Sequence, residues 1–297
     1  MLNKTEKEIM KNWQGNISKP IVSVCTITYN HEKYIHEAID SFLMQETDFP
    51  FEIIIGEDCS IDTTKKIVEE YIQKYPNIIR LITSDNNVGM QENGKRTIEA
   101  CLGKYIAICE GDDFWTDKNK LQIQKDFLYN NFEYVICYTD CQPFNENGLM
   151  NIDFGGARRD LTTDELQKAT PIYTLTVMFK NVIKEFPQEY LFSKYGDVFI
   201  WSMLGEYGKG KYLPQIKPSA YRVHQGGLYS MISKEKKIDM AFHTYFALFI
   251  YHNSKNNKVI ANHYKMEILW LFLKNDLKSF LFFIFKKIKN RLQREIK

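Results

Sequence analysis

The sequence lacks most of the features that mark specialised classes of protein. Proline and glycine are scarce, at 8 and 15 of 297 residues, and 44% of the residues are hydrophobic, so collagen-like and wholly disordered chains are excluded. The six cysteines form no CxxC pair, and the closest two, Cys137 and Cys141, lack the second ligand pair that a zinc site needs. We therefore expect reduced thiols that behave as small buried apolar side chains.

Signals for export and for membrane insertion are also missing. Residues 1–13 carry charges throughout and have no apolar segment typical of a signal peptide. A run such as Phe280–Phe285 is far shorter than the roughly 20 residues that a membrane-spanning helix requires. The net charge of only +2 gives no general reason to expect nucleic-acid binding. The sequence thus predicts a cytoplasmic protein without a nucleic-acid partner.

Positive charge is nevertheless concentrated at the C-terminal end. Residues 274–297 contain eight basic and two acidic residues, a local charge of +6, which leaves −4 on the rest of the chain. From residue 268 onward, large apolar residues alternate with lysines, as in a basic amphipathic helix. Two interpretations are open: the helix contacts an anionic membrane surface peripherally, or it packs on the rest of the chain or on a second copy. We expect membrane contact, and the oligomeric state stays open.

The first 131 residues alternate between apolar, β-branched segments and segments of helical period. Strands are predicted at 21–27, 51–58, 77–84 and 104–113, and helices at 33–45, 63–75, 92–102 and 118–131. Continuous apolar strands between amphipathic helices predict an α/β fold with a parallel sheet covered on both faces. In such sheets ligands bind at the carboxyl ends of the strands.

The pattern changes after residue 134. Strands are predicted at 134–144 and 174–180, helices from Thr162 or Thr163 and within 196–208, an extended segment at 211–224, and helix from about 234 to the end. We expect one domain over residues 1–230, with halves at about 20–130 and about 131–230. A helical extension is expected over residues 231–297.

The most informative segment is EGDD, which directly follows the fourth predicted strand. Glu110, Asp112 and Asp113 crowd three carboxylates together, which raises their pKa values unless a cation or donor offsets the repulsion. Such oxygen ligands suit Mg²⁺ or Mn²⁺, which bind through one or two carboxylates and substrate phosphates. A solvated acidic turn that caps the next helix explains the segment equally well.

Polar residues at two further strand ends favour the first interpretation. Glu57 and Asp58 end the second strand, where helix capping needs only one such residue, and the segment TYN at 28–30 ends the first. Three strand ends therefore offer polar groups to one crevice, which predicts a nucleotide site. The GxGxxG and GxxxxGK[ST] loops of dinucleotide and P-loop sites are absent from the first strand end.

Three segments together resemble a known family. SVCTITYNHEKYIHEAIDSFLMQ, EIIIGEDCSIDTT and NNVGMQENGKRTIEACLGKYIAICEGDDFW are similar, in this order, to the nucleotide-sugar half of glycosyltransferase family 2. The similarity covers about residues 21–124 and returns at 195–201 and 221–227, which resemble acceptor-side motifs of bacterial surface-polysaccharide enzymes. The resemblance implies the GT-A fold, a Rossmann-like, mostly parallel sheet with helices on both faces and a C-terminal helical extension.

The resemblance also implies roles for single residues. The donor-binding residues would be Thr28, Tyr29, Asn30, Glu57, Asp58, Arg96, Glu110, Gly111, Asp112 and Arg222. Asp112 would bind the Mn²⁺ or Mg²⁺ that bridges the two donor phosphates, and Glu110 and His224 are further metal candidates. Glu110 stands where the family usually has Asp, so its longer side chain could reach the sugar or a water instead. An isolated histidine such as His224 is otherwise structural or faces solvent.

Asp197 matches the position of the family's catalytic base. A carboxylate there would take the proton of an acceptor hydroxyl and make the enzyme inverting, through a single displacement. The alternative is that Asp197 is the N-cap of the helix that follows.

These inferences predict a metal-dependent, inverting glycosyltransferase. It would move a sugar from a nucleotide-diphosphate donor, expected to be a UDP-sugar, to a glycan or lipid-linked glycan in capsule, O-antigen or lipooligosaccharide synthesis. Such an enzyme would work in the cytoplasm, with peripheral contact to the inner face of the membrane. Two alternatives are open: a nucleotidyltransferase, and an inactive scaffold subunit that binds nucleotide or carbohydrate.

Overall fold

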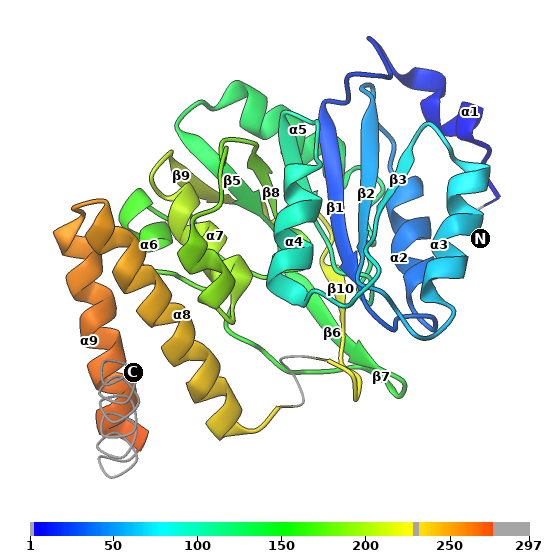
Figure 1. The fold of residues 1–297 in the computed structure, drawn as a ribbon. Coiled ribbons are helices and arrows are strands. Elements are labelled where there is room, and N and C mark those ends of the chain that lie inside the picture. Colours follow the sequence, from blue (N-terminus) through cyan, green and yellow to red (C-terminus); the bar gives the residue numbers. More distant parts are fainter. Residues whose placement is uncertain (1–2, 228–231, 276–297) are drawn as a thin grey trace.

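The core of the structure is a mostly parallel sheet (Figure 1). The computed structural model describes residues 3–227 and 232–275. The seven strands are ordered β3 (Ile79–Ile82), β2 (Phe51–Glu57), β1 (Val22–Thr28), β4 (Tyr105–Ile108), β8 (Met178–Lys180), β5 (Tyr134–Tyr138) and β9 (Lys209–Tyr212). Only β8 runs antiparallel to its neighbours. A second sheet is ordered β10 (Ser219–Arg222), β6 (Cys141–Asn145) and β7 (Gly148–Leu149).

Alternating side chains of the buried strands pack against helices on both faces of the sheet. In β2, Ile53 and Ile55 join the core under α2 (Ile35–Leu43), α3 (Thr64–Lys74) and α5 (Lys120–Asn130). Ile54 joins the opposite core, under α4 (Met90–Glu99), α7 (Gly196–Leu204) and α8 (Lys234–Ser254). The period of two in a strand sends neighbouring residues to opposite faces, which is why all three are apolar. The predicted fold class is confirmed.

The C-terminal helices form a hairpin on the second face. α8 packs beside α9 (Lys258–Asn275), and Leu248, Tyr251 and Tyr264 bury their side chains toward the domain (Figure 1). Across residues 3–227 and 232–275, every helix is too short or too polar to cross a membrane. The predicted amphipathic tail lies largely beyond residue 275, outside the described residues. Shorter helices complete the chain: α1 (Glu6–Ile9), α6 (Thr163–Gln167) and 3₁₀ helices at Met10–Asn12, Thr174–Thr176 and Gln188–Phe192.

Two sequence predictions were wrong in detail. The strand expected over 134–144 is two strands, β5 and β6, in different sheets, because the chain turns at Asp140, whose carboxylate accepts a hydrogen bond from the Cys141 N–H at 2.9 Å. The strand expected over 174–180 is extended only in β8, and its first residues form a 3₁₀ helix. The predicted start of α6 is confirmed, since Thr162 and Glu165 form a reciprocal capping box.

Candidate active site

The ends of β1, β2 and β4 meet at one edge of the sheet. Thr28 is paired with Glu57 across β1 and β2. The Asp58 N–H donates to the Thr28 carbonyl at 3.1 Å, and the Gly111 N–H donates to the Ile27 carbonyl at 3.0 Å. The three strand ends singled out by sequence therefore adjoin through backbone hydrogen bonds, so their polar side chains share one region.

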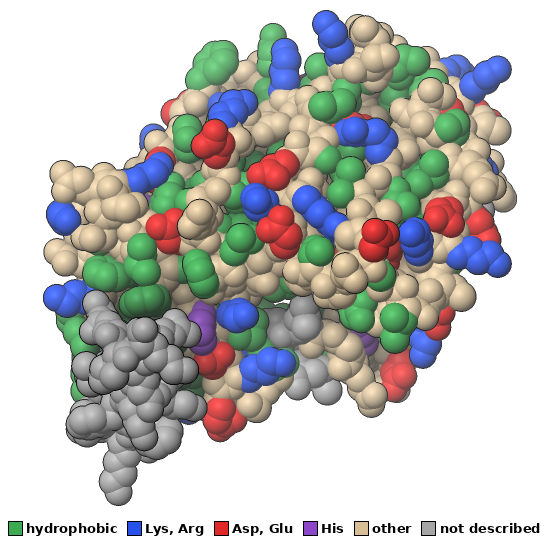
Figure 2. All heavy atoms as spheres, in the orientation of Figure 1, with side chains coloured by type: hydrophobic (Ala, Val, Ile, Leu, Met, Phe, Trp, Pro, Cys, Tyr) green, Lys and Arg blue, Asp and Glu red, His purple; other side chains and the backbone are tan. Residues whose placement is uncertain are grey.

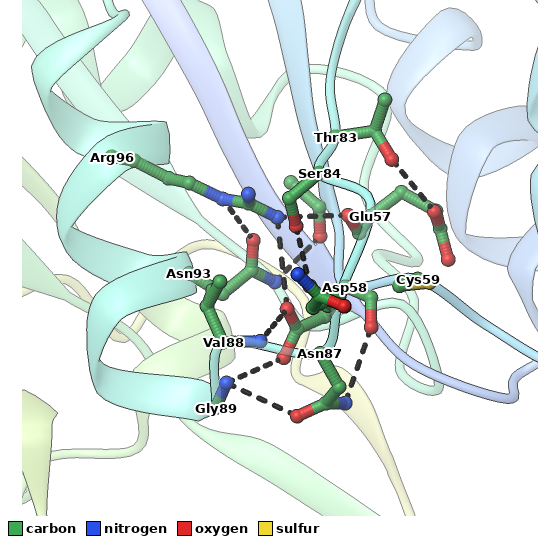
Figure 3. Close-up of polar contacts among 12 residues, drawn as sticks. Glu57, Asp58, Cys59, Thr83, Ser84, Asn87, Val88, Gly89, Asn93 and Arg96 are labelled. Atoms are coloured by element: carbon green, nitrogen blue, oxygen red, sulfur yellow. Dashed lines mark hydrogen bonds and ion pairs between the residues drawn. The ribbon is translucent and has the colours of Figure 1, made fainter.

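The carboxylates of Glu57 and Asp58 accept hydrogen bonds from the loops on one side of this region (Figure 3). Asp58 accepts hydrogen bonds from the N–H groups of Val88 and Gly89, at 2.8 and 3.0 Å, at the start of α4. Arg96 lies 3.7 Å from the Asp58 carboxylate, and its guanidinium also donates to the Glu57 carbonyl at 2.9 Å. A negative charge at a helix N-terminus is favourable. Asp58 therefore fixes the turn before α4, and any ligand would share its carboxylate with these donors.

The carboxylate of Glu57 points to the other side of the same loop. It accepts hydrogen bonds from the Ser60 N–H at 2.6 Å and from the Thr83 hydroxyl at 3.1 Å. The helix-capping interpretation is wrong for α3, whose N-cap is Thr63 without a side-chain capping hydrogen bond. Asp62, just before it, accepts a hydrogen bond from the Thr64 N–H at 2.9 Å.

The TYN segment divides into a buried and an exposed part. The Thr28 hydroxyl is buried and has no hydrogen-bond partner within the described part of the chain. It lies beneath Gly111, where a Cβ would come within 2.8 Å of the Thr28 Oγ1. Tyr29 is 41% exposed. Asn30 adopts φ +56° and ties this loop to the next by accepting a hydrogen bond from the Ile61 N–H at 2.9 Å. Gly111 thus has a packing role, and Tyr29 is the side chain open to a ligand.

Asp112 lies between two imidazoles. Its Oδ2 is 2.9 Å from Nε2 of His224 and 3.9 Å from Nε2 of His31. The Gly226 N–H donates to Nδ1 of His224 at 3.2 Å, so Nδ1 is an acceptor and Nε2 carries the hydrogen that is donated to the carboxylate. Burial raises the pKa of Asp112, but the hydrogen bond from His224 and the fields of both histidines outweigh it and leave the pKa below normal.

The neighbouring acidic residues, Glu110 and Asp113, have raised pKa values. Burial, with the charges of Asp112 and Asp197, raises the pKa of Glu110 to about 8. Burial and the charges of Asp112 and Glu110 likewise raise the pKa of Asp113. Asp113 accepts a hydrogen bond from the Arg222 N–H at 2.7 Å, which joins the acidic loop to β10. A cation near Asp112 would relieve the repulsion at Glu110.

Asp197 approaches the acidic loop from the first turn of α7. The N-cap of this helix is Tyr195, so the interpretation of Asp197 as N-cap is wrong. Its Oδ2 accepts a hydrogen bond from the Thr174 hydroxyl at 2.8 Å, and its Oδ1 accepts one from the Val198 N–H, also at 2.8 Å. Burial raises the pKa of Asp197, and these two hydrogen bonds offset part of the rise. A carboxylate with a raised pKa and a fixed orientation is suited to accept a proton.

The guanidinium group of Arg222 is already engaged by other residues of the protein. Its guanidinium donates to the Asp112 carbonyl at 2.8 Å and to the Glu37 carboxylate at 2.9 Å. It also lies 4.6 Å from the ring centroids of both Tyr34 and Phe144. Arg222 therefore clamps the acidic loop between α2 and the small sheet, and a phosphate would have to compete for its donors.

Three residues of this region escaped the sequence analysis. His31 follows Asn30 directly, and only its position after a strand end could have marked it. Thr174 falls in a segment that the sequence predicted as strand. Lys120 is buried, burial lowers its pKa to about 7, and its ammonium group donates to the Thr176 carbonyl at 2.6 Å. It ties α5, which follows the acidic loop, to the 3₁₀ helix that carries Thr174.

The donor set fits a divalent cation held partly by a ligand. In the described ranges, no three His, Cys, Asp or Glu side chains converge as a complete metal-binding group. Ions such as Mg²⁺ in phosphate sites commonly take only one or two carboxylates from the protein and complete their shell with phosphate and water oxygens. Asp112 supplies one carboxylate with His224 beside it, and the crowded charge at Glu110 favours a cation nearby.

Comparison with known sequences identifies the class of protein. Residues 23–185, more than half of the chain, match Glycosyl transferase family 2, and the protein belongs to this family. It is 33% identical over 169 residues to the putative teichuronic acid biosynthesis glycosyltransferase TuaG of Bacillus subtilis, covering 57% of this chain and 64% of TuaG. It is 39% identical over 162 residues to the uncharacterized protein Rv1520 of Mycobacterium tuberculosis, covering 54% of this chain and 47% of that protein. The chain thus spans about half to under two thirds of these curated relatives.

Solved structures agree on the fold. S. aureus TarS 1-349 in complex with UDP-GlcNAc superposes with a TM-score of 0.57 and 21% identity, covering 76% of this chain and 66% of that one. The mannosyltransferase PcManGT from Pyrobaculum calidifontis, in complex with GDP-Man and Mn²⁺, gives a TM-score of 0.56 and 16% identity, covering 84% and 70%. At these identities the likeness establishes the GT-A architecture alone.

Proposed function

We propose that the protein transfers a sugar from a nucleotide-diphosphate donor, most simply a UDP-sugar, to a glycan acceptor of a bacterial surface polysaccharide. The observation that carries this proposal is that the segments with Asp58 and Asp112 both bond to the end of β1, and that the charge of Asp197 acts on Glu110 of the second segment. Family membership, the name of TuaG and the UDP-GlcNAc complex of TarS support it.

The donor would lie along the strand ends. Tyr29 is an exposed aromatic side chain that could flank the base. The ion pair of Asp58 and Arg96 would face the base or ribose. The Thr28 hydroxyl, which has no hydrogen-bond partner among the described residues, lies at the end of β1, next to Tyr29. The diphosphate would extend toward Asp112, where a divalent cation, Mn²⁺ or Mg²⁺, would be held with His224 or Glu110 beside it. When bound, such a cation stabilises the negative charge that develops on the leaving nucleoside diphosphate.

Asp197 would act as the base. Thr174 and the Val198 N–H hold its carboxylate, and each carboxylate oxygen keeps a lone pair that can accept the proton of an acceptor hydroxyl. Attack by that oxygen on the anomeric carbon, on the side opposite the departing phosphate, would invert the configuration. Arg222 and Asp113 would hold the acidic loop in position during this step.

The proposal extends to the domain boundaries and the cellular location. Residues 1–230 would form the catalytic domain, and residues 231–297 a helical extension. A cytoplasmic location is supported by six free thiols, five of them buried, which suit a reducing compartment.

The test measures donor binding and turnover separately. UDP, GDP and their sugars are titrated calorimetrically with and without Mn²⁺, and release of the nucleoside diphosphate is then followed with the best donor. We expect tighter binding of one nucleotide sugar in Mn²⁺ and slow release of its nucleoside diphosphate. Release of pyrophosphate from a nucleoside triphosphate would instead identify a nucleotidyltransferase, and binding without any turnover would identify a scaffold.

A further inference from the structure

The last turns of α9 present an apolar face to solvent. Met266, Leu269, Trp270 and Leu273 are 49%, 38%, 51% and 62% exposed. Their spacing of i, i+3, i+4 and i+7 places them on one side of the helix. The Phe272 ring, in contrast, packs on Phe242 of α8 at 5.4 Å between centroids. α9 therefore has one apolar side for the hairpin and a second that remains open. We call Met266, Leu269, Trp270 and Leu273 the outer face of α9.

The outer face is bordered by positive charge. The Lys274 ammonium lies 5.9 Å from the Trp270 ring, and α8 begins with Lys234, Lys236 and Lys237. These four lysines outnumber the acidic Glu235 of α8 and Glu267 of α9. The sequence beyond residue 275 adds seven basic and two acidic residues. Figure 2 shows hydrophobic side chains at the α8–α9 end of the molecule, near Lys and Arg side chains. Trp, Leu and Lys in this combination suit the boundary between headgroups and acyl chains of a membrane.

Charge decides between an anionic membrane and a second copy of the chain. Two copies that met through the outer face would bring Lys274 of one copy close to Lys274 of the other, and like charges repel. An anionic lipid surface instead attracts lysines beside an apolar helix face. The apolar face and the charge around it thus favour an anionic membrane over a second copy of the chain.

The hairpin also contacts the segment that leads into the site. α8 begins and α9 ends on the side of the molecule where β1 and β2 reach their carboxyl ends (Figure 1). Thr244 of α8 is buried, and its hydroxyl oxygen accepts hydrogen bonds from the N–H groups of Lys194 and Tyr195 at 3.2 and 3.0 Å. These residues lead directly into α7 and Asp197. The hairpin is therefore packed against the segment that carries Asp197 into the site.

We propose that the outer face of α9 and the lysines around it dock the protein on an anionic lipid bilayer. The docking itself depends only on the hairpin. Its consequence, access to an acceptor carried by the membrane, rests on the proposed function.

The experiment uses the full chain and vesicles of phosphatidylcholine, alone or with 30% phosphatidylglycerol. We expect sedimentation with the anionic vesicles that weakens in high salt, and at least tenfold weaker binding for the double variant Trp270→Ser/Leu273→Ser. The matched control is Val259→Ser, which changes a residue that is 70% exposed at the other end of α9 and should bind like the wild type. Circular dichroism and nucleotide affinity in solution verify that both variants remain folded.

Three outcomes would overturn the docking: no binding by the wild-type chain, equal binding of both vesicle types, or unchanged binding by the double variant. A double variant that only converts dimers to monomers would assign the outer face to a second copy. Failure of the proposed function is a separate result, because release of the nucleoside diphosphate is measured without vesicles. Lipid binding without turnover would support the docking and reject the enzymatic function. Turnover without lipid binding would support the enzymatic function and reject the docking.

Discussion

Oδ2 of Asp112 lies 2.9 Å from Nε2 of His224, although 112 positions of sequence separate the two residues. The contact forms because the segment after β10 returns to the acidic loop, where the Phe114 N–H and carbonyl pair with the backbone of Ala220. His31 approaches the same carboxylate from the loop after β1. A carboxylate between two imidazoles is the centre of the proposed site.

Asp112→Asn should lower turnover of the donor by about 100-fold or more, because the amide cannot provide the anionic oxygen that a divalent cation prefers. Calorimetry should show that the gain in nucleotide affinity on adding Mn²⁺ disappears. The matched control is Asp164→Asn, which removes an exposed carboxylate that pairs with Lys168. Equal turnover in Asp112→Asn and wild type would refute a metal role for this residue.

Thr174→Val should shift the pH dependence of turnover. Burial raises the pKa of Asp197, and the hydrogen bond from Thr174 lowers it. Loss of that hydrogen bond raises the pKa further, so the acidic limb of the kcat profile should move to higher pH, since the base must be ionised to act. Asp197→Asn should remove turnover while donor affinity in solution stays intact. An unchanged profile in Thr174→Val would argue against Asp197 as the base.

Thr244→Val should disturb the segment that leads to Asp197. The variant leaves the N–H groups of Lys194 and Tyr195 without their acceptor, which costs about 1–3 kcal/mol of unfolding free energy. We expect a lower kcat with little change in the KM for the donor, because the donor site lies on other elements. Thr244→Ser keeps the hydroxyl and should restore kcat. Urea denaturation and steady-state kinetics measure both effects.

His252 should make the protein less stable in mild acid. Its Nε2 lies 2.8 Å from the Ser202 hydroxyl oxygen, and burial lowers its pKa from 6.5 to about 4. Between these two values the unfolded chain binds a proton that the folded chain does not, so stability falls as the pH drops from 6.5 toward 4. The full loss is about 3 kcal/mol.

Urea denaturation at pH 7.5 and pH 5 measures this loss. His252→Gln should reduce the difference between the two pH values, whereas the exposed His36→Gln should leave it unchanged. A wild-type protein that is equally stable at both pH values would contradict the assignment.

Gly111→Ala should damage the strand-end site. A Cβ there would lie 2.8 and 2.9 Å from Oγ1 and Cβ of Thr28 and 3.0 Å from Cδ1 of Ile35. Overpacking of this kind costs about 1–3 kcal/mol and displaces the acidic loop, so nucleotide affinity should fall. Gly94→Ala is the control, because its Cβ would meet only the Tyr190 hydroxyl, at 3.3 Å. Calorimetry with UDP compares the two variants.

The sequence alone determined the architecture around β1, β2 and β4. Runs such as IVSVCTI and FEIII and the helical segments between them carry local periodicities, and local periodicity is what sequence patterns record. It also determined that acidic groups would gather at the ends of these strands, because parallel strands bring their carboxyl ends to one edge. The roles of single residues at that edge stay predictions.

The tertiary structure alone decided what those side chains contact. No pattern along the chain shows that Arg222 is already engaged by Glu37, that Thr174 holds Asp197, or that β8 enters the sheet antiparallel between β4 and β5. These relationships join segments far apart in sequence, and they depend on how the packed elements bring side chains together. Packing of distant elements leaves no periodic signal in either partner, so only the folded chain shows which charges are paired and which remain for a ligand.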